Sequence, residues 1–350
     1  MDKKQRLKKV FGIDQAEKLT PAEKDMLLRS ILTDVHNHRR IKRLRWYTAA
    51  AAALLIVSFT FYYSNRDHRE LDVDLVKIAK TNEAKFADHE QIQIAATDLQ
   101  TQNFAVESLD IDEHTSHKLY YALPTSDLPS DERVSYATLY IPFGKRQEFQ
   151  LPDGSTVWLN AGSYLTFDKS MDGTSREVYL NGEGYFDVKH TGTPFIVKTK
   201  HANIQVLGTT FNLSAYEDDE HTAVDLLTGK VRFESAKKLF SAITLTPGER
   251  VDYNSVRAHI NIDKKSAGTD ILWTKKQLAF DNVPLAVLMR KLERVYNVEI
   301  IAEESLYTSS PSYSGRLNID VDIISLLKNI YELNDYNFTR HEKEVKITRK

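Results

Sequence analysis

Hydrophobic and polar positions divide the chain at one uncharged stretch, Trp46 to Tyr63. It consists mostly of alanine and large apolar residues, with aromatic rings at both ends. As a helix rising about 1.5 Å per residue it would span roughly 27 Å, close to the hydrocarbon thickness of a bilayer. A helix of a soluble protein normally keeps a polar face, and this stretch has none, which argues against a buried core helix. The pattern therefore predicts one transmembrane helix over residues 46–63.

The charges beside this stretch predict its orientation. Residues 64–67, which follow it, are nearly neutral in sum, whereas basic residues cluster just before it, at Arg39, Arg40, Lys42, Arg43 and Arg45. Basic residues concentrate on the cytoplasmic side of membrane helices, so residues 1–45 are expected in the cytoplasm and the rest on the far side. A cleaved signal peptide fits poorly, because the preceding segment is too long and no A-x-A-like cleavage site follows.

The predicted cytoplasmic segment, residues 1–45, contains one well-marked helix. Thr20-Pro21-Ala22-Glu23 offers a capping threonine, a proline for the first turn and a capping-box glutamate. Apolar residues then recur on one helical face, at Leu28, Ile31, Leu32 and Val35. So short a segment cannot enclose a core of its own. Its apolar face is expected to bind a protein partner in a groove, with association with the membrane surface as the alternative.

Residues 64–133 are polar and acidic and show no sustained period. Pro124 and Pro129, with Asp and Ser beside them, mark a loop near the end of the stretch. We interpret residues 64–133 as a partly ordered periplasmic linker that holds the next domain off the membrane, and we assign no chemistry to it.

Short apolar runs separated by glycine-containing turns fill residues 134–262, which predicts an all-β domain. Asp153-Gly154 between two apolar runs is a strong hairpin signal, because both residues tolerate positive φ. The runs Glu177–Leu180 and Tyr185–Val188 likewise predict two strands joined by a turn at 181–184. A sandwich and a solenoid with short rungs fit this pattern equally well.

Residues 270–350 show both the helical and the strand-like spacing of apolar residues. Helical stripes begin at Asn282 and at Asp320, and apolar runs around them predict strands at 277–280, 298–301, 313–317, 336–338 and 345–347. The predicted order is β-α-β-β-α-β-β. It is typical of a small α+β sheet with its helices on one face.

Composition removes several kinds of chemistry. The chain has 350 residues and no cysteine, which excludes disulfides, thiolate nucleophiles and cysteine metal sites. Its formal net charge of −2 combines a basic N-terminal segment with an acidic remainder. Direct nucleic-acid binding is not predicted, because the basic segment lacks helix-turn-helix spacing.

Two candidate sites in the β domain have simpler interpretations. His221 follows four consecutive acidic residues, 217–220, but neighbouring side chains diverge along a strand or turn, which favours an exposed acidic loop over a metal site. Asp153, Asp187 and Asp225 could be imagined as glycosidase carboxylates, yet no pairing can be read. The sequence therefore predicts no catalytic residue, metal or cofactor.

An ordered set of motifs runs through the β domain: LPDGSTVWLNAGS at 151–163, REVYLNGEGYFDV at 176–188, PFIV at 194–197, VLGTTFN at 206–212, LTGKV at 227–231 and LTPGE at 245–249. This set resembles the FecR family of transmembrane anti-sigma regulators. The resemblance implies structural turns at Asp153, Gly154, Gly182, Gly184, Gly208, Gly229 and Gly248.

The C-terminal residues extend the resemblance. Residues 278–285 and 292–298 and the run Gly315-Arg316-Leu317 are similar to the domain that commonly follows the FecR domain. Its element order is similar to that of the signalling domain of TonB-dependent outer-membrane transducers. The resemblance implies a single-pass regulator of the cell inner membrane that is not an enzyme, with a cytoplasmic N-terminus and a periplasmic C-terminus.

The resemblance also implies partners. These are an extracytoplasmic-function sigma factor, the signalling domain of a TonB-dependent outer-membrane receptor and a site-2-type intramembrane protease. The sigma factor is expected to contact Leu27, Leu28, Ile31, Leu32 and Val35. The segment lacks the tryptophan-centred helical pattern of well-studied members, so inhibition and activation of the sigma factor both remain open. The alternatives are a membrane-anchored glycan-binding or adhesion module, with Trp158 and Tyr164 as its platform, and an envelope hydrolase.

Overall fold

The fold is seen in a computed structural model of the chain. The structure describes residues 20–22, 26, 75–84, 86, 90–98, 104–109, 117–118, 135–171, 173–264, 271–303, 306–307, 312–330 and 333–350. Within these ranges, no helix has both the length and the apolar character needed to cross a membrane. The predicted span 46–63 and the predicted sigma-factor contacts Leu27, Leu28, Ile31, Leu32 and Val35 lie outside the described residues.

The unit that begins at Asp74 starts with helix α3 (Leu75–Glu83) and strands β1 (Ile92–Asp98), β2 (Phe104–Leu109) and β3 (His117–Lys118). α3 buries Leu75, Ile78, Ala79 and Asn82, and β1 pairs with β4 (Ser135–Ile141). The interpretation of residues 64–133 as a linker is therefore wrong for these elements, which belong to the folded unit.

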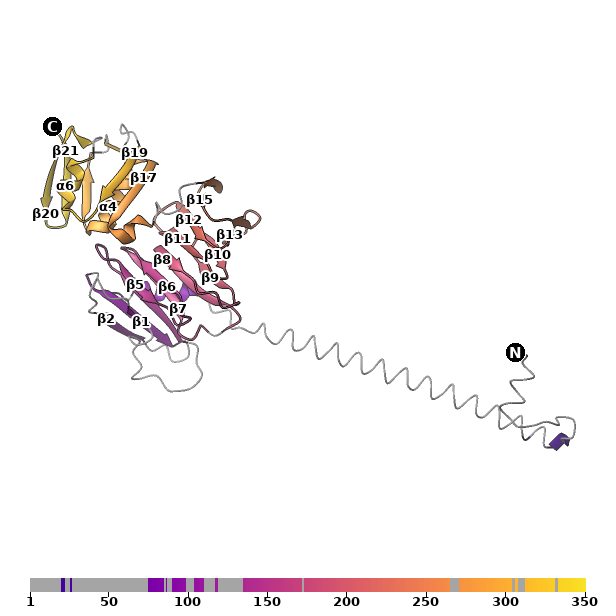
Figure 1. Ribbon diagram of the computed structural model, residues 1–350. Helices are drawn as coiled ribbons and strands as arrows, with labels where there is room; N and C mark the ends of the chain where they lie inside the picture. Colours follow the sequence, from indigo (N-terminus) through magenta and orange to yellow (C-terminus); the bar gives the residue numbers. More distant parts are fainter. Residues whose placement is uncertain are drawn as a thin grey trace. The chain divides into compact units, whose positions relative to one another are not determined.

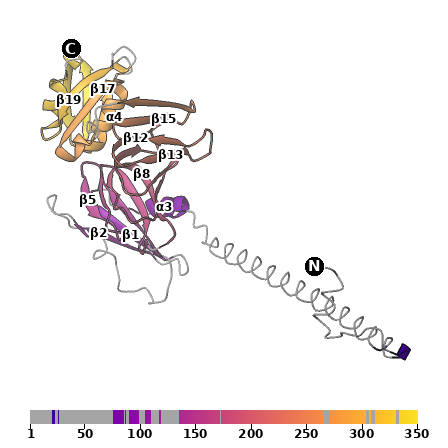
Figure 2. The ribbon, with the colours of Figure 1, turned by 45° about the vertical axis from the view of Figure 1, so that its right-hand side comes forward.

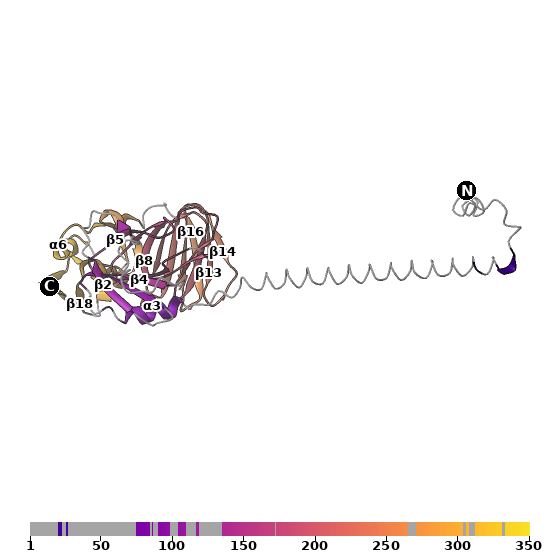
Figure 3. The same cartoon turned by 90° about the horizontal axis from the view of Figure 1, so that it is seen from below.

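Strands β1 to β16 form one connected sheet of sixteen described strands, which curls like a half-barrel (Figure 1, Figure 3). The sequence left a sandwich and a solenoid open, and the structure instead shows one connected, curled sheet. The remaining strands are β5 (Gln147–Gln150), β6 (Thr156–Leu159), β7 (Ser163–Asp168), β8 (Arg176–Asp187), β9 (Phe195–Lys198), β10 (Ala202–Val206), β11 (Thr210–Ala215), β12 (His221–Thr228), β13 (Val231–Ser235), β14 (Ile243–Leu245), β15 (Glu249–Asn254) and β16 (His259–Lys264).

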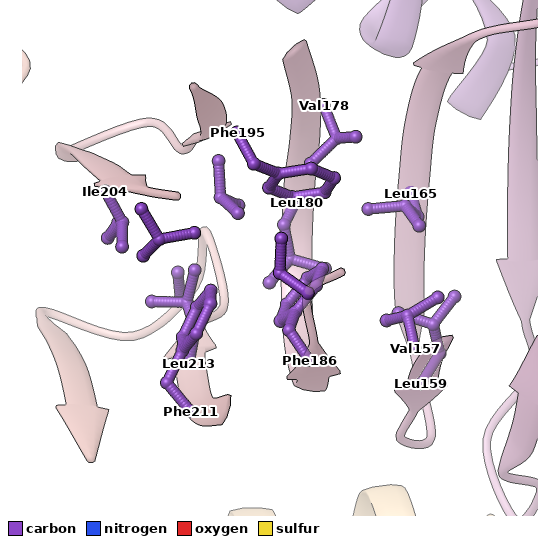
Figure 4. Packing of buried hydrophobic residues seen from close by; sticks show 14 of the residues in the cluster. Val157, Leu159, Leu165, Val178, Leu180, Phe186, Phe195, Ile204, Phe211 and Leu213 are labelled. Carbon is purple, nitrogen blue, oxygen red and sulfur yellow. The ribbon is translucent and has the colours of Figure 1, made fainter. Parts of the chain in front are cut away.

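The concave side of this sheet holds the larger core. In strands such as β9 and β10 alternate residues are buried, as the period of two requires, whereas β8 and β12 bury consecutive residues. Figure 4 shows how these apolar side chains meet between the strands, with Val157, Leu159, Leu165, Val178, Leu180, Phe186, Phe195, Ile204, Phe211 and Leu213 labelled.

The turn expected at Gly182 and Gly184 is not present in the structure. These glycines lie inside one continuous strand, β8, which pairs with β7 up to Asn181 and with β6 and β11 from there on. The strand passes from one part of the sheet to the other at Gly182, whose φ is +131°. Only glycine readily adopts this conformation, so the residue serves a bend within a strand and not a hairpin.

The C-terminal region has the predicted element order. Its elements are β17 (Gln277–Val283), α4 (Leu285–Tyr296), β18 (Glu299–Ala302), β19 (Tyr313–Asn318), α6 (Ile323–Lys328), β20 (Tyr336–His341) and β21 (Glu344–Arg349). The prediction of one sheet is wrong, because β17 pairs with β19 while β18, β21 and β20 form a separate sheet. Residues of both sheets and both helices share one apolar core.

Candidate functional site at the junction of the curled sheet and helix α4

Helix α4 has two chemically different faces. Leu285, Leu288, Met289 and Leu292 are buried in the C-terminal core. Arg290, Lys291 and Arg294 lie on another side of the helix, since Arg294 follows Lys291 by three positions and Arg290 by four, and residues at these spacings share a face. All three cations contact carboxylates of the curled sheet. Figure 2 shows α4 beside this sheet.

Arg294 makes the densest set of contacts. Its Nη2 donates to both carboxylate oxygens of Asp218 at 2.8 Å, and its Nη1 donates to Asp219 at 3.1 Å. The guanidinium lies 3.8 Å from the ring centre of Tyr216, and the Arg294 side chain is only 9% exposed. Charge-assisted, bidentate bonds and a cation–π contact are among the stronger polar interactions in proteins.

A second arginine and a tyrosine complete this attachment. Arg290 Nε lies 3.3 Å from Asp219. Burial raises the pKa of the Tyr216 hydroxyl, which stays protonated and donates to the backbone oxygen of Ala161 at 2.9 Å. The residues 217–220, here called the acidic turn, join β11 to β12 and thus bind α4. The predicted acidic loop is present, and Asp218 and Glu220 are exposed in it. The sequence did not predict that Asp218 and Asp219 also contact α4.

A second attachment surrounds Glu183 of β8, whose side chain is 2% exposed. Its carboxylate accepts hydrogen bonds from Asn160 at 2.7 Å and Asn212 at 3.2 Å, and Lys291 lies 3.4 Å away. Asn212 in turn accepts a bond from the buried indole of Trp273 at 3.2 Å. A buried carboxylate is tolerated only with such partners, so these residues fix the position of α4 against the sheet.

Helix α3 is attached to the same acidic turn. Asn181 donates to Glu83 of α3 at 3.2 Å and accepts from the backbone nitrogen of Glu217 at 3.1 Å. The Glu217 carboxylate also accepts from Tyr179 at 2.7 Å and lies 3.8 Å from Lys80. The acidic turn is thus in contact with α3 through Glu217 and with α4 through Asp218 and Asp219.

The Glu83 carboxyl gives a pH-dependent prediction. Burial, and to a smaller degree Glu217, raises its pKa above the ordinary 4.5, while Asn181 and Lys80 oppose the shift. Ionisation therefore disfavours the folded state, and this cost grows as pH rises through 4.5 towards the folded pKa. Glu83→Gln keeps the acceptor for Asn181 without the charge. It should raise the midpoint of thermal unfolding of the full-length chain at pH 7, with a difference that fades below pH 4.5.

Glu249→Gln is the matched control for this measurement. A hydrogen bond from the Thr246 backbone nitrogen lowers the pKa of the Glu249 carboxyl, so its neutralisation should shift the midpoint in the opposite direction at pH 7. A lower midpoint for Glu83→Gln than for the unsubstituted chain at pH 7 would contradict the assignment.

The motif residues have structural partners in the sheet. Asp153 accepts from Ser155 and pairs with Arg176 at 2.6 Å. Gly154, Gly208, Gly229 and Gly248 lie in connections between strands. The other two acidic candidates also have structural partners. Asp187 accepts a hydrogen bond from Thr210, and Asp225 forms an ion pair with Arg250.

The two aromatic residues of the adhesion alternative are half-buried and pack against other side chains. Trp158 packs against the C-terminal core, and Tyr164 stacks on Tyr140 with ring centres 4.7 Å apart and meets Phe86 at 5.8 Å. His221 contacts Asp252, and the described residues include no group of three or more His, Cys, Asp or Glu that could hold a metal ion.

Sequence reasoning missed Arg290, Lys291 and Arg294 as a set. Their spacing on one side of α4, opposite the apolar stripe, was the available signal. It does not name the partner, because Asp218 lies 76 positions before Arg294.

Comparison with known proteins places these two regions in one family. The family model described as FecR protein matches residues 137–232, and the one described as FecR, C-terminal, matches residues 277–347. The chain belongs to the FecR family. The acidic turn and Glu183 fall in the first FecR match and α4 in the second, so the junction joins the two matched regions.

Solved structures agree with this assignment. Two crystal structures of a "putative anti-sigma factor" from Parabacteroides distasonis ATCC 8503, at 2.50 and 1.65 Å resolution, are 28% and 27% identical to this FecR-family chain. Each alignment has a TM-score of 0.56 and covers 61% of this chain and 99% of the other. The curated proteins give no match. FecR-family anti-sigma factors are regulators and not enzymes.

Proposed function

We propose that the chain is an anti-sigma regulator of the inner membrane. Its residues 1–45 bind an extracytoplasmic-function sigma factor, and its periplasmic part receives a signal from a TonB-dependent outer-membrane transducer. The observation that carries the proposal is the combination of both FecR matches with likeness to a crystallised "putative anti-sigma factor", which aligns with 61% of this chain.

The sequence supports the membrane topology of this proposal. The uncharged stretch 46–63 is long enough to span a bilayer, and the basic residues before it favour a cytoplasmic N-terminus. A lone helix is a poor rigid lever, so the signal crosses by assembly of partners or by cleavage, for which a site-2-type intramembrane protease is the fitting partner.

The C-terminal region supports a protein partner on the periplasmic side. In its three-stranded sheet the order is β18-β21-β20, so β18 and β20 are the end strands among those described. An end strand can accept a strand from another protein, with main-chain hydrogen bonds supplying affinity. We assign the transducer's signalling domain to this region.

Charge substitutions on the predicted cytoplasmic helix test the sigma-factor site. Leu28→Glu combined with Ile31→Glu places two charges on the apolar face, which would have to be desolvated in a groove. Recovery of the sigma factor in a pull-down with the full-length chain should fall at least tenfold, equivalent to about 1.4 kcal/mol.

Ser30→Glu is the control, because position 30 lies on the opposite side of the same helix. It should leave recovery within about twofold, since a surface charge is worth little there. Unchanged recovery with the double variant would remove Leu28 and Ile31 from the proposed site.

A further inference from the structure

We infer that the acidic turn couples the two ends of the folded unit, so that displacement of α4 loosens α3. This inference deepens the proposed function, because it assigns a route from the transducer-binding region to the residues that follow the predicted membrane span. The route consists of α4, the acidic turn and α3, and the described contacts give each step.

The first step is the attachment of α4. Arg294 holds two consecutive residues of the acidic turn at once, Asp218 through both carboxylate oxygens and Asp219 through one. The Arg294 backbone oxygen also accepts from Gly144 at 2.8 Å, which fixes the helix itself. Movement of α4 away from the sheet therefore breaks bonds to the turn or carries the turn with it.

The second step lies within the turn. Glu217 directly precedes Asp218, so the backbone that positions one carboxylate also positions the other. The Glu217 backbone nitrogen bonds to Asn181, and its backbone oxygen accepts from Lys200 at 3.2 Å. A shift of the turn therefore changes the hydrogen bond between Glu217 and the Asn181 side chain. The same side chain binds Glu83 of α3.

The third step is the low intrinsic stability of α3. This helix has nine residues, of which only Leu75, Ile78, Ala79 and Asn82 are buried. An isolated helix of this length does not persist in water, so its order depends on its contacts with the sheet. Loss of the Asn181–Glu83 and Glu217–Lys80 contacts at its C-terminal end should raise its local opening more than that of the core strands.

The position of α3 in the sequence links the coupling to the predicted membrane span. About a dozen residues separate Tyr63, the end of the predicted span, from Leu75, and they reach at most roughly 40 Å when extended. α3 is therefore the first described element of the folded unit after the predicted span, whereas the C-terminal strands lie at the other end of the sequence. The two sites are joined by named contacts and not by proximity alone.

Hydrogen exchange on the full-length chain tests the coupling. Arg294→Ala should accelerate exchange of the α3 amides about tenfold, within the range of typical coupling factors, while amides of β8 and β11 stay protected. Arg290→Ala is the matched control, because Arg290 is 45% exposed and contacts only Asp219 of the acidic turn. It should change α3 exchange less than twofold.

A second, more conservative variant keeps the test valid if Arg294→Ala fails to fold. Asp218→Asn keeps the side-chain shape but removes the charge that Arg294 binds, and it should accelerate α3 exchange in the same direction by a smaller factor. Faster exchange confined to α4, with α3 unchanged in both variants, would overturn the coupling. The readout needs neither sigma factor nor transducer, so a failed pull-down with coupled exchange would reject the proposed function alone.

Discussion

Arg176→Met is expected to lower the free energy of unfolding by about 3–5 kcal/mol, as for other broken buried ion pairs. Arg176 Nη1 lies 2.6 Å from the carboxylate of Asp153, and both side chains are 3% exposed. The guanidinium also donates to the backbone oxygens of Lys189, Thr193 and Leu207. The substitution therefore leaves a buried carboxylate and three carbonyls without this donor. Denaturant unfolding of the full-length chain measures the loss.

The neighbouring surface pair provides the control. Glu177 and Lys198 lie 2.6 Å apart, but each is 30% exposed, so Glu177→Gln should cost no more than about 1 kcal/mol. Adding Asp153→Ala to Arg176→Met should recover part of the stability, because it removes the unpaired charge. A loss for Arg176→Met as small as that for Glu177→Gln would show that the buried pair does not hold the motif together.

Gly182→Ala should be the second strongly destabilising change, on the order of 3 kcal/mol. A Cβ at this position would lie 2.3 Å from Ser163 Oγ and 2.6 Å from Ser163 Cα, so backbone would have to move. Overpacking and a φ of +131° each contribute roughly 1–3 kcal/mol. The loss should appear as a lower midpoint in the same unfolding experiment.

Gly192→Ala separates the two causes. Gly192 also has a positive φ, +85°, but nothing lies within 4 Å of its added Cβ. Its substitution should cost only the backbone part, about 1 kcal/mol. Equal losses at the two positions would mean that the contact with Ser163 contributes nothing to the need for glycine at 182.

The local pattern predicted the C-terminal region well, because each element carries its own signal. Leu285, Leu288, Met289 and Leu292 are buried as the helical spacing requires, and the strand at Val345 and Ile347 lies in the same core. Strand partners depend on contacts distant in sequence. The division into two sheets, with parallel pairing of β18 and β21, was therefore not predictable from these runs.

Some residue types occur for more than one physical reason, and at such positions the sequence alone did not predict the structure fully. The run Asn181-Gly182-Glu183-Gly184 has turn composition, yet Gly182 serves a bend within β8 and Glu183 is a buried partner of Lys291. Residues 217–220 form the exposed acidic turn that their composition predicts, with Asp218 68% exposed, but their contact with Arg294 was not predictable because Arg294 is distant in sequence. The acidic composition around α3 hid a helix that is ordered by its packing on the sheet.

Co-purification tests the proposed function most directly. The full-length chain, extracted in mild detergent, should retain a co-expressed extracytoplasmic-function sigma factor in comparable amounts. Retention should be lost when Leu28 and Ile31 both carry glutamate and kept when Ser30 does. Recovery of folded full-length chain without any candidate sigma factor would contradict the account.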